Sequence, residues 1–269
     1  MHPDSADERI QQGDDAESGT IRLRRPGLLA FGGAVLSLVA GALHPGTQPP
    51  NQHAAVFAEY AASSTWTAVH LAQFVGMALL IAGLLGVLDT LGRVTPGRAP
   101  AWLVRLGMLL ASVALGVYGV LQAVDGVALK QAVDAWASAS ESERAARFAA
   151  AEAVRWLEWG ARSYQSLVLG AALLLAGAAL LRSQRSLRIA GGTMAASGLA
   201  YLAQGWVLGV EGFSDANTVP TLAGYVLVFA WIIAVQVAAA PPWRRAPGAT
   251  RVAAGGRGAG APGRGETRG

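Results

Sequence analysis

Three of the four histidines lie in one stretch of the chain, at His44, His53 and His70. Two imidazoles at neighbouring helix ends are able to bind a transition metal or to act as axial ligands of a haem. Gln73 and Met77 follow His70 at helical spacing and share its face, and a methionine is a further axial ligand type. The stretch has no His-x-x-x-His pair, so we expect neither a metal nor a cofactor here.

A second group of polar residues is ionic. Gln122 and Asp125 stand three residues apart on one helix face, and Glu152, Arg155 and Glu158 follow in a later segment at the same spacing. Ionisable groups at a membrane boundary are costly unless they pair, which makes them candidates for a binding site. We expect a structural clamp between Asp125 and Arg155. The candidate ligand-binding set is His44, His70, Gln73, Gln122, Asp125, Glu152, Arg155 and Glu158.

No motif of a known enzyme class accompanies these groups. The chain contains no GxSxG or HExxH pattern and no glycine–lysine phosphate-binding loop. It has no cysteine, which excludes thiol chemistry, disulfides and Fe–S clusters. We therefore predict no catalytic residues, and the sequence favours a protein without enzymatic activity.

The elements that must position these groups are membrane helices. The chain is 53% hydrophobic and only 14% charged, too little polar surface for a soluble globule of 269 residues. The pI near 9.9 reflects short basic clusters beside apolar segments, a pattern typical of cytoplasmic flanks and not of nucleic-acid binding.

The apolar segments predict an all-α polytopic membrane protein with six transmembrane helices and an amphipathic extracytoplasmic helix. Lys and Arg concentrate in both tails and in the turns 92–100 and 182–188, which places both termini in the cytoplasm and the chain in the cell membrane. We expect residues 1–26 and 241–269 to be disordered tails. The predicted spans cover about 27–43, 68–91, 101–123, 163–181, 189–210 and 219–240.

The amphipathic helix is predicted between the third and fourth spans. Ser140 and Glu143 have the spacing of a capping box, which indicates a helix from about 141 to 160. Phe148, Trp156 and Trp159 give this helix an apolar side, so we expect it to lie on the outer membrane surface.

Small residues predict where helices pack closely. Gly33, Ser37 and Gly41 recur every four residues on one face of the first span, which allows another backbone to approach. The fifth span is crowded with small residues and ends in the GxxxG pattern of Gly205 and Gly209, so we place it in the middle of the bundle. A homodimer through such a face is the alternative.

Three runs carry a resemblance to a known group of proteins. HPGTQPPNQHAAVFAEYAASSTWTAVHLAQFVG, LQAVDGVALKQAVDAW and AAAEAVRWLEWGARSYQ resemble segments of uncharacterised six-span integral membrane proteins of actinobacteria, of the domain-of-unknown-function type. The resemblance covers residues 27–240. It implies the fold and a bacterial plasma-membrane location, and it transfers no functional residue.

Three classes of function remain open. The first is non-enzymatic binding of a lipid, a small ligand or a partner at the outer face. The alternatives are a small transporter built from two three-span halves, and a haem or metal redox protein that uses the outer histidines. A polar cavity lined by His70, Gln73 and Asp125 would favour ligand binding or redox chemistry, whereas a filled bundle would favour a structural or partner-binding role.

Overall fold

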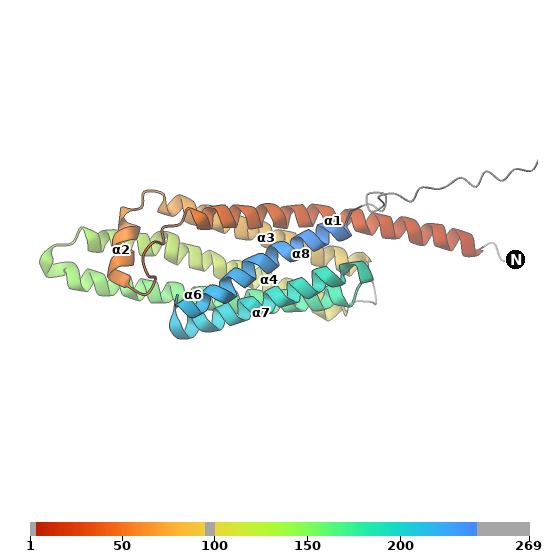
Figure 1. Ribbon diagram of the computed structural model, residues 1–269. Helices are drawn as coiled ribbons and strands as arrows, with labels where there is room; N and C mark the ends of the chain where they lie inside the picture. Colours follow the sequence, from red (N-terminus) through yellow and green to blue (C-terminus); the bar gives the residue numbers. More distant parts are fainter. Residues whose placement is uncertain (1–3, 95–99, 241–269) are drawn as a thin grey trace, which may run out of the picture.

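The computed structural model describes residues 4–94 and 100–240, and over those ranges every regular element is a helix (Figure 1). The all-α prediction is therefore confirmed. The long helices are α1 (Asp4–Ala42), α3 (Trp66–Val94), α4 (Ala101–Ala123), α6 (Glu141–Leu181), α7 (Arg188–Glu211) and α8 (Thr218–Ala238). Two short helices are α2 (His53–Ala62) and α5 (Lys130–Ala137), a π-helical segment covers Val124–Leu129, and 3-10 turns cover Arg185–Leu187 and Asp215–Asn217.

Five helical stretches are long and apolar enough to cross a membrane, which indicates a membrane protein. Large apolar side chains such as Leu38, Leu109 and Val226 are exposed on the outside of the bundle, as lipid-facing positions would be. α7 has a similar length, but its glycine, alanine and polar residues keep it outside this group of five. The five stretches are Leu23–Ala42, Trp66–Arg93, Ala101–Ala137, Glu141–Leu181 and Asp215–Ala238.

The N-terminal segment differs from its prediction. α1 begins at Asp4 and continues through Pro26, so most of the expected disordered tail is helical. Residues that join an existing helix do not meet the cost of nucleation, and alanine, glutamate, glutamine and arginine extend a helix readily. The predicted C-terminal tail, 241–269, lies outside the described residues.

α1 and α3 pack with their backbones in contact. A Cβ atom placed on Gly33 would lie 2.3 Å from the Leu80 nitrogen, and one on Gly76 would lie 2.4 Å from the Ser37 hydroxyl. This confirms the predicted role of Gly33 and Ser37. Gly41 has open space beside it, so its assignment to the same contact face is wrong.

The small residues of α7 face α6 within the same chain. Cβ atoms on Gly198 and Gly205 would come within 2.7 Å of atoms of α6. The opposite side of α7 exposes Leu199 and Trp206, which corrects the prediction that this helix lies in the middle of the bundle. The face expected to support a homodimer is therefore occupied by α6, with Gly209 next to Ser163.

This packing predicts opposite effects for two glycines of α7. Gly198→Ala should lower the free energy of unfolding by at least about 1 kcal/mol, because the new methyl group would lie 2.7 Å from the Gly170 carbonyl oxygen. Gly192→Ala meets no atom within 4 Å and should be neutral or stabilising, since alanine favours a helix more than glycine. Thermal unfolding in detergent would compare the two variants, and equal effects would contradict the close packing.

α6 is longer than the amphipathic helix that the sequence predicted. The helix begins at Glu141 as expected, but it continues without a break to Leu181 instead of ending near residue 160. At 1.5 Å per residue its 41 residues extend about 60 Å, roughly twice the thickness of a bilayer core. Gly160 alone costs a helix only about 1 kcal/mol, too little to end it. The first half of α6 therefore projects beyond the bundle.

The projecting part is stabilised by its own apolar core. We call the cap the assembly of α2, the π-helical segment, α5 and residues 141–158 of α6, which extends past one end of the bundle in Figure 1. The apolar side of α6 thus packs on protein, although Trp156 and Leu157 remain exposed. The buried residues of this core are Val56, Phe57, Tyr60, Trp66, Leu129, Val133 and Ala151.

Candidate metal centre and polar cavity

Asp125 lies where the bundle meets the cap. It is buried inside the π-helical segment that continues α4, and such wide turns are frequent at functional sites. The next residue must be small, because a Cβ atom on Gly126 would lie 2.7 Å from the Cβ atom of His70. Gly126 therefore lets α3 bring His70 against this segment.

Trp66, the first residue of α3, fixes the positions of His70 and Asp125. Its indole N–H donates to the Asp125 backbone carbonyl at 2.9 Å, and its own carbonyl accepts from Nδ1 of His70 at 2.8 Å. Nε2 of His70 then lies 3.0 Å from the Oδ2 atom of Asp125. Trp66 is only 1% exposed, so this link is shielded from water.

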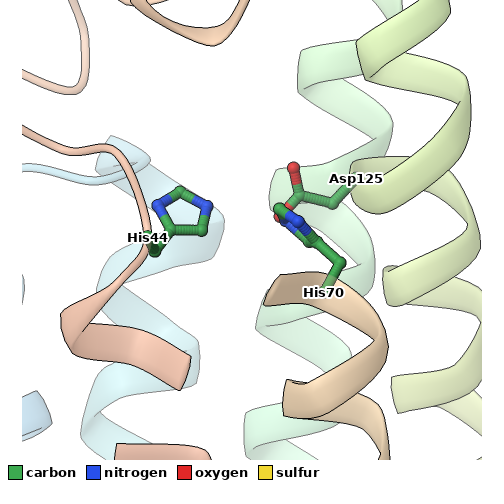
Figure 2. A group of neighbouring side chains, drawn as sticks. All are labelled: His44, His70 and Asp125. Atoms are coloured by element: carbon green, nitrogen blue, oxygen red, sulfur yellow. The ribbon is translucent and has the colours of Figure 1, made fainter. Parts of the chain in front are cut away.

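His44 lies in the turn that follows α1 and faces His70 and Asp125 across a gap that Figure 2 shows. Its ring centroid lies 5.0 Å from that of His70, and its Nδ1 atom lies 2.6 Å from the Pro45 carbonyl oxygen. The following loop is held to α2, because Thr47 donates to the Glu59 carboxylate through its backbone N–H and its hydroxyl, each at 2.9 Å. Burial lowers the pKa of His44 and favours the neutral imidazole, while the Asp125 carboxylate opposes part of that shift.

The proton positions on both rings favour metal binding. A carbonyl oxygen only accepts hydrogen bonds, so Nδ1 of His44 and of His70 carries a proton, and Nε2 of each ring presents a lone pair whenever that ring is neutral. One ligand atom from each of His44, His70 and Asp125 lies within 4.8 Å of the other two. A backbone carbonyl on the second ring nitrogen is the usual support of a metal-binding histidine.

Two atoms of this group are buried without a hydrogen-bond partner among the described residues. They are Nε2 of His70 and Oδ1 of Asp125. Nε2 lies 3.0 Å from the Oδ2 atom of Asp125, so a protonated His70 ring would pair with that carboxylate, whereas a neutral ring leaves both atoms available to a cation. Buried polar atoms that lack a partner are costly, and a bound cation would satisfy both.

A polar cavity of about 280 Å³ adjoins this group. It is lined by His44, Gln73 and Asp125, with Gln122 donating to Gln73 at 3.4 Å. His70 contacts Asp125 but is not part of the cavity wall. The bundle is therefore not filled at this end, and two of the three residues expected to line a polar cavity do so.

Arg155 pairs with a different carboxylate from the one expected. It binds Glu158 on the next turn of α6, while Asp125 contacts His70, so the predicted clamp between Asp125 and Arg155 does not form. The Arg155 guanidinium also lies 4.8 Å from the ring centroid of Phe213. Arg155 and Glu158 are each 3% exposed, and both line the cavity.

Glu152 is separate from the other candidate residues. Its carboxylate lies 2.9 Å from Nδ1 of His53 and joins α6 to α2 inside the cap. It does not line the cavity. Of the predicted set, Glu152 alone is thus placed away from the cavity and the metal-ligand group.

Sequence reasoning missed Trp66 as a positioning residue and the tyrosines of the cavity wall. Tyr60 comes from α2, Tyr118 from α4, Tyr201 from α7 and Tyr225 from α8. Aromatic residues in apolar segments are usually core or interfacial, so their types and spacing gave no signal. Only the folded bundle shows that the four side chains reach one cavity.

Comparison with known proteins finds no matching family model, no similar curated protein and no similar solved structure. The candidate site therefore has to be interpreted from its own geometry.

Proposed function

We propose that this chain is an integral membrane protein that binds a divalent transition-metal ion through His44, His70 and Asp125. The observation that carries the proposal is the convergence of three ligand atoms within 4.8 Å, one from the turn after α1, one from α3 and one from the π-helical segment. Two imidazoles and one carboxylate suit zinc, iron, manganese and related ions, and geometry and availability then select among them. Because of this convergence we favour metal binding over the metal-free binding that the sequence analysis favoured.

The proposed metal ion would have three protein ligands and at least one coordination position without a protein ligand. Three protein ligands leave at least one coordination position, as in catalytic zinc sites, whereas structural sites are closed by a fourth protein ligand. His44 and Asp125 line the cavity, so an ion held by them would be within reach of a small ligand that enters the cavity. We therefore interpret the site as one that binds a small molecule at a metal.

A metal titration tests this function. Protein stripped with a chelator should bind one equivalent of Zn²⁺ or Co²⁺ per chain in isothermal titration calorimetry. His70→Ala, His44→Ala and Asp125→Asn should each lower the affinity at least tenfold, because each removes one of three ligands. His53→Ala is the matched control, since His53 is a partly buried histidine paired with Glu152 outside the group. No binding in the unaltered protein would refute the proposal.

The proposed topology has six spans, with α7 as the fifth, both termini in the cytoplasm and the cap outside the cell membrane. The positions of the basic residues and the length of α7 support this arrangement. The chain contains no cysteine, so single cysteines are unambiguous probes. Ser64→Cys and Ser138→Cys should react with an impermeant thiol reagent in intact cells, and Ser186→Cys should react only after lysis. The reverse pattern would invert the topology.

A further inference from the structure

Arg162 is a cation of the cavity wall without a carboxylate partner among the described residues. Four residues before it, Glu158 offers the spacing of a helical ion pair, but Glu158 is bound to Arg155. The Asp125 carboxylate contacts His70. An arginine beneath a membrane boundary is costly unless something compensates its charge, so such a residue is a functional candidate.

Three tyrosines share the cavity wall with Arg162. Tyr118, Tyr201 and Tyr225 line the same cavity as Arg162, and each comes from a different helix. Tyr118 and Tyr201 are 4% and 5% exposed, so their rings are held by packing. A guanidinium and three phenolic O–H groups on the wall of one cavity provide several hydrogen-bond donors to a ligand inside it.

Helix register separates this group from the metal ligands. Tyr118 precedes Asp125 by seven residues on α4, and Arg162 follows Arg155 by seven residues on α6, which is about 10 Å along each helix. Arg162 and its tyrosines therefore lie deeper in the bundle than Asp125, with the cavity joining the two groups.

We propose that Arg162 and these tyrosines bind the oxyanion group, a carboxylate or a phosphate, of a small ligand that enters the cavity. Arginine matches planar or tetrahedral oxyanions because it donates two parallel hydrogen bonds. The proposal goes beyond metal binding and does not depend on it, since its residues are not metal ligands. The oxyanion comes either from a soluble molecule or from a lipid headgroup.

The test uses the full chain in detergent, stripped of metal and kept at constant chloride. Inorganic phosphate, acetate and dihexanoyl phosphatidic acid are the probes, and the midpoint of thermal unfolding is the readout. At least one probe should raise the midpoint in a saturable way. Arg162→Gln should weaken that apparent affinity at least tenfold, while Arg147→Gln, at an exposed position of the same helix, should leave it unchanged.

The variants separate the two proposals. His70→Ala should lose metal affinity and keep the shift of the unfolding midpoint that the oxyanion causes. Arg162→Gln should keep metal affinity and lose that shift. If Arg162→Gln does not fold, Arg162→Lys replaces it and should retain the charge but weaken binding, because lysine cannot donate two parallel bonds. Tighter binding of phosphatidic acid than of phosphate identifies a lipid headgroup, and the opposite order identifies a soluble ligand. The absence of any saturable shift, or the same shift in Arg162→Gln, would overturn the proposal.

Discussion

Replacing Arg155 with alanine should lower the free energy of unfolding by about 3–5 kcal/mol, the range for breaking one partner of a buried ion pair. The Glu158 carboxylate is 3% exposed and would be left buried without its cation. The variant would also lose the contact of the guanidinium with the ring of Phe213, at 4.8 Å from its centroid, and with that of Tyr60, at 5.5 Å. Denaturant titration in detergent measures this difference.

Arg144→Ala is the matched control on the same helix. Arg144 is exposed and lies 5.9 Å from the ring centroid of Trp136, an interaction worth about 0.5–1 kcal/mol at an exposed site. We expect its effect to stay within that range. Similar losses in the two variants would mean that Arg155 is solvated in the membrane-embedded protein, and that the cap is not anchored by this ion pair.

Trp66→Phe should weaken metal binding by about 10–100-fold, the usual range for losing a residue that orients metal ligands. Phenylalanine keeps most of the buried ring but removes the N–H that holds the Asp125 carbonyl at 2.9 Å. The π-helical segment would then be free to shift, and Asp125 with it. The Trp66 carbonyl that orients His70 is retained, so the loss should be smaller than in His70→Ala.

Trp156→Phe is the comparison for this prediction. Trp156 is 57% exposed on α6 and does not line the cavity, so its replacement should leave the affinity for Zn²⁺ unchanged. Calorimetric titration of both variants, with circular dichroism to check helix content, separates a positioning effect from general unfolding. Equal affinities in Trp66→Phe and the unaltered protein would show that Asp125 is held by other contacts.

Much of the helical layout follows from the sequence because apolar length and helix signals act locally. Five of the predicted spans overlap stretches that are long and apolar enough to cross a membrane, and α6 starts at Glu141 as predicted. The predicted capping box does not form, because the Ser140 hydroxyl makes no cap hydrogen bond and donates to the Glu143 carboxylate at 3.3 Å. The end of the predicted amphipathic helix was wrong, since Trp159 to Ser163 contains no residue that stops a helix. A change from polar to apolar composition at that point marks a change of environment and not a break in the backbone.

The candidate site was only partly predictable for a related reason. His44, His70 and Asp125 were each identified by type, but their convergence depends on the π-helical segment and on Gly126, neither of which has a recognisable spacing. Arg155 was assigned to the wrong carboxylate because three acids, Asp125, Glu152 and Glu158, were candidates in the sequence, and only the fold places His70 against Asp125. Long-range partners of this kind are set by tertiary packing.

X-ray absorption spectroscopy of the zinc-loaded protein tests the central claim most directly. The account predicts nitrogen and oxygen neighbours at about 2.0–2.2 Å with outer-shell scattering from two imidazoles. The scattering should fall to one imidazole in His44→Ala and in His70→Ala, and it should remain at two in His53→Ala. A spectrum without imidazole scattering, or one that changes only in His53→Ala, would contradict a metal centre formed by His44, His70 and Asp125.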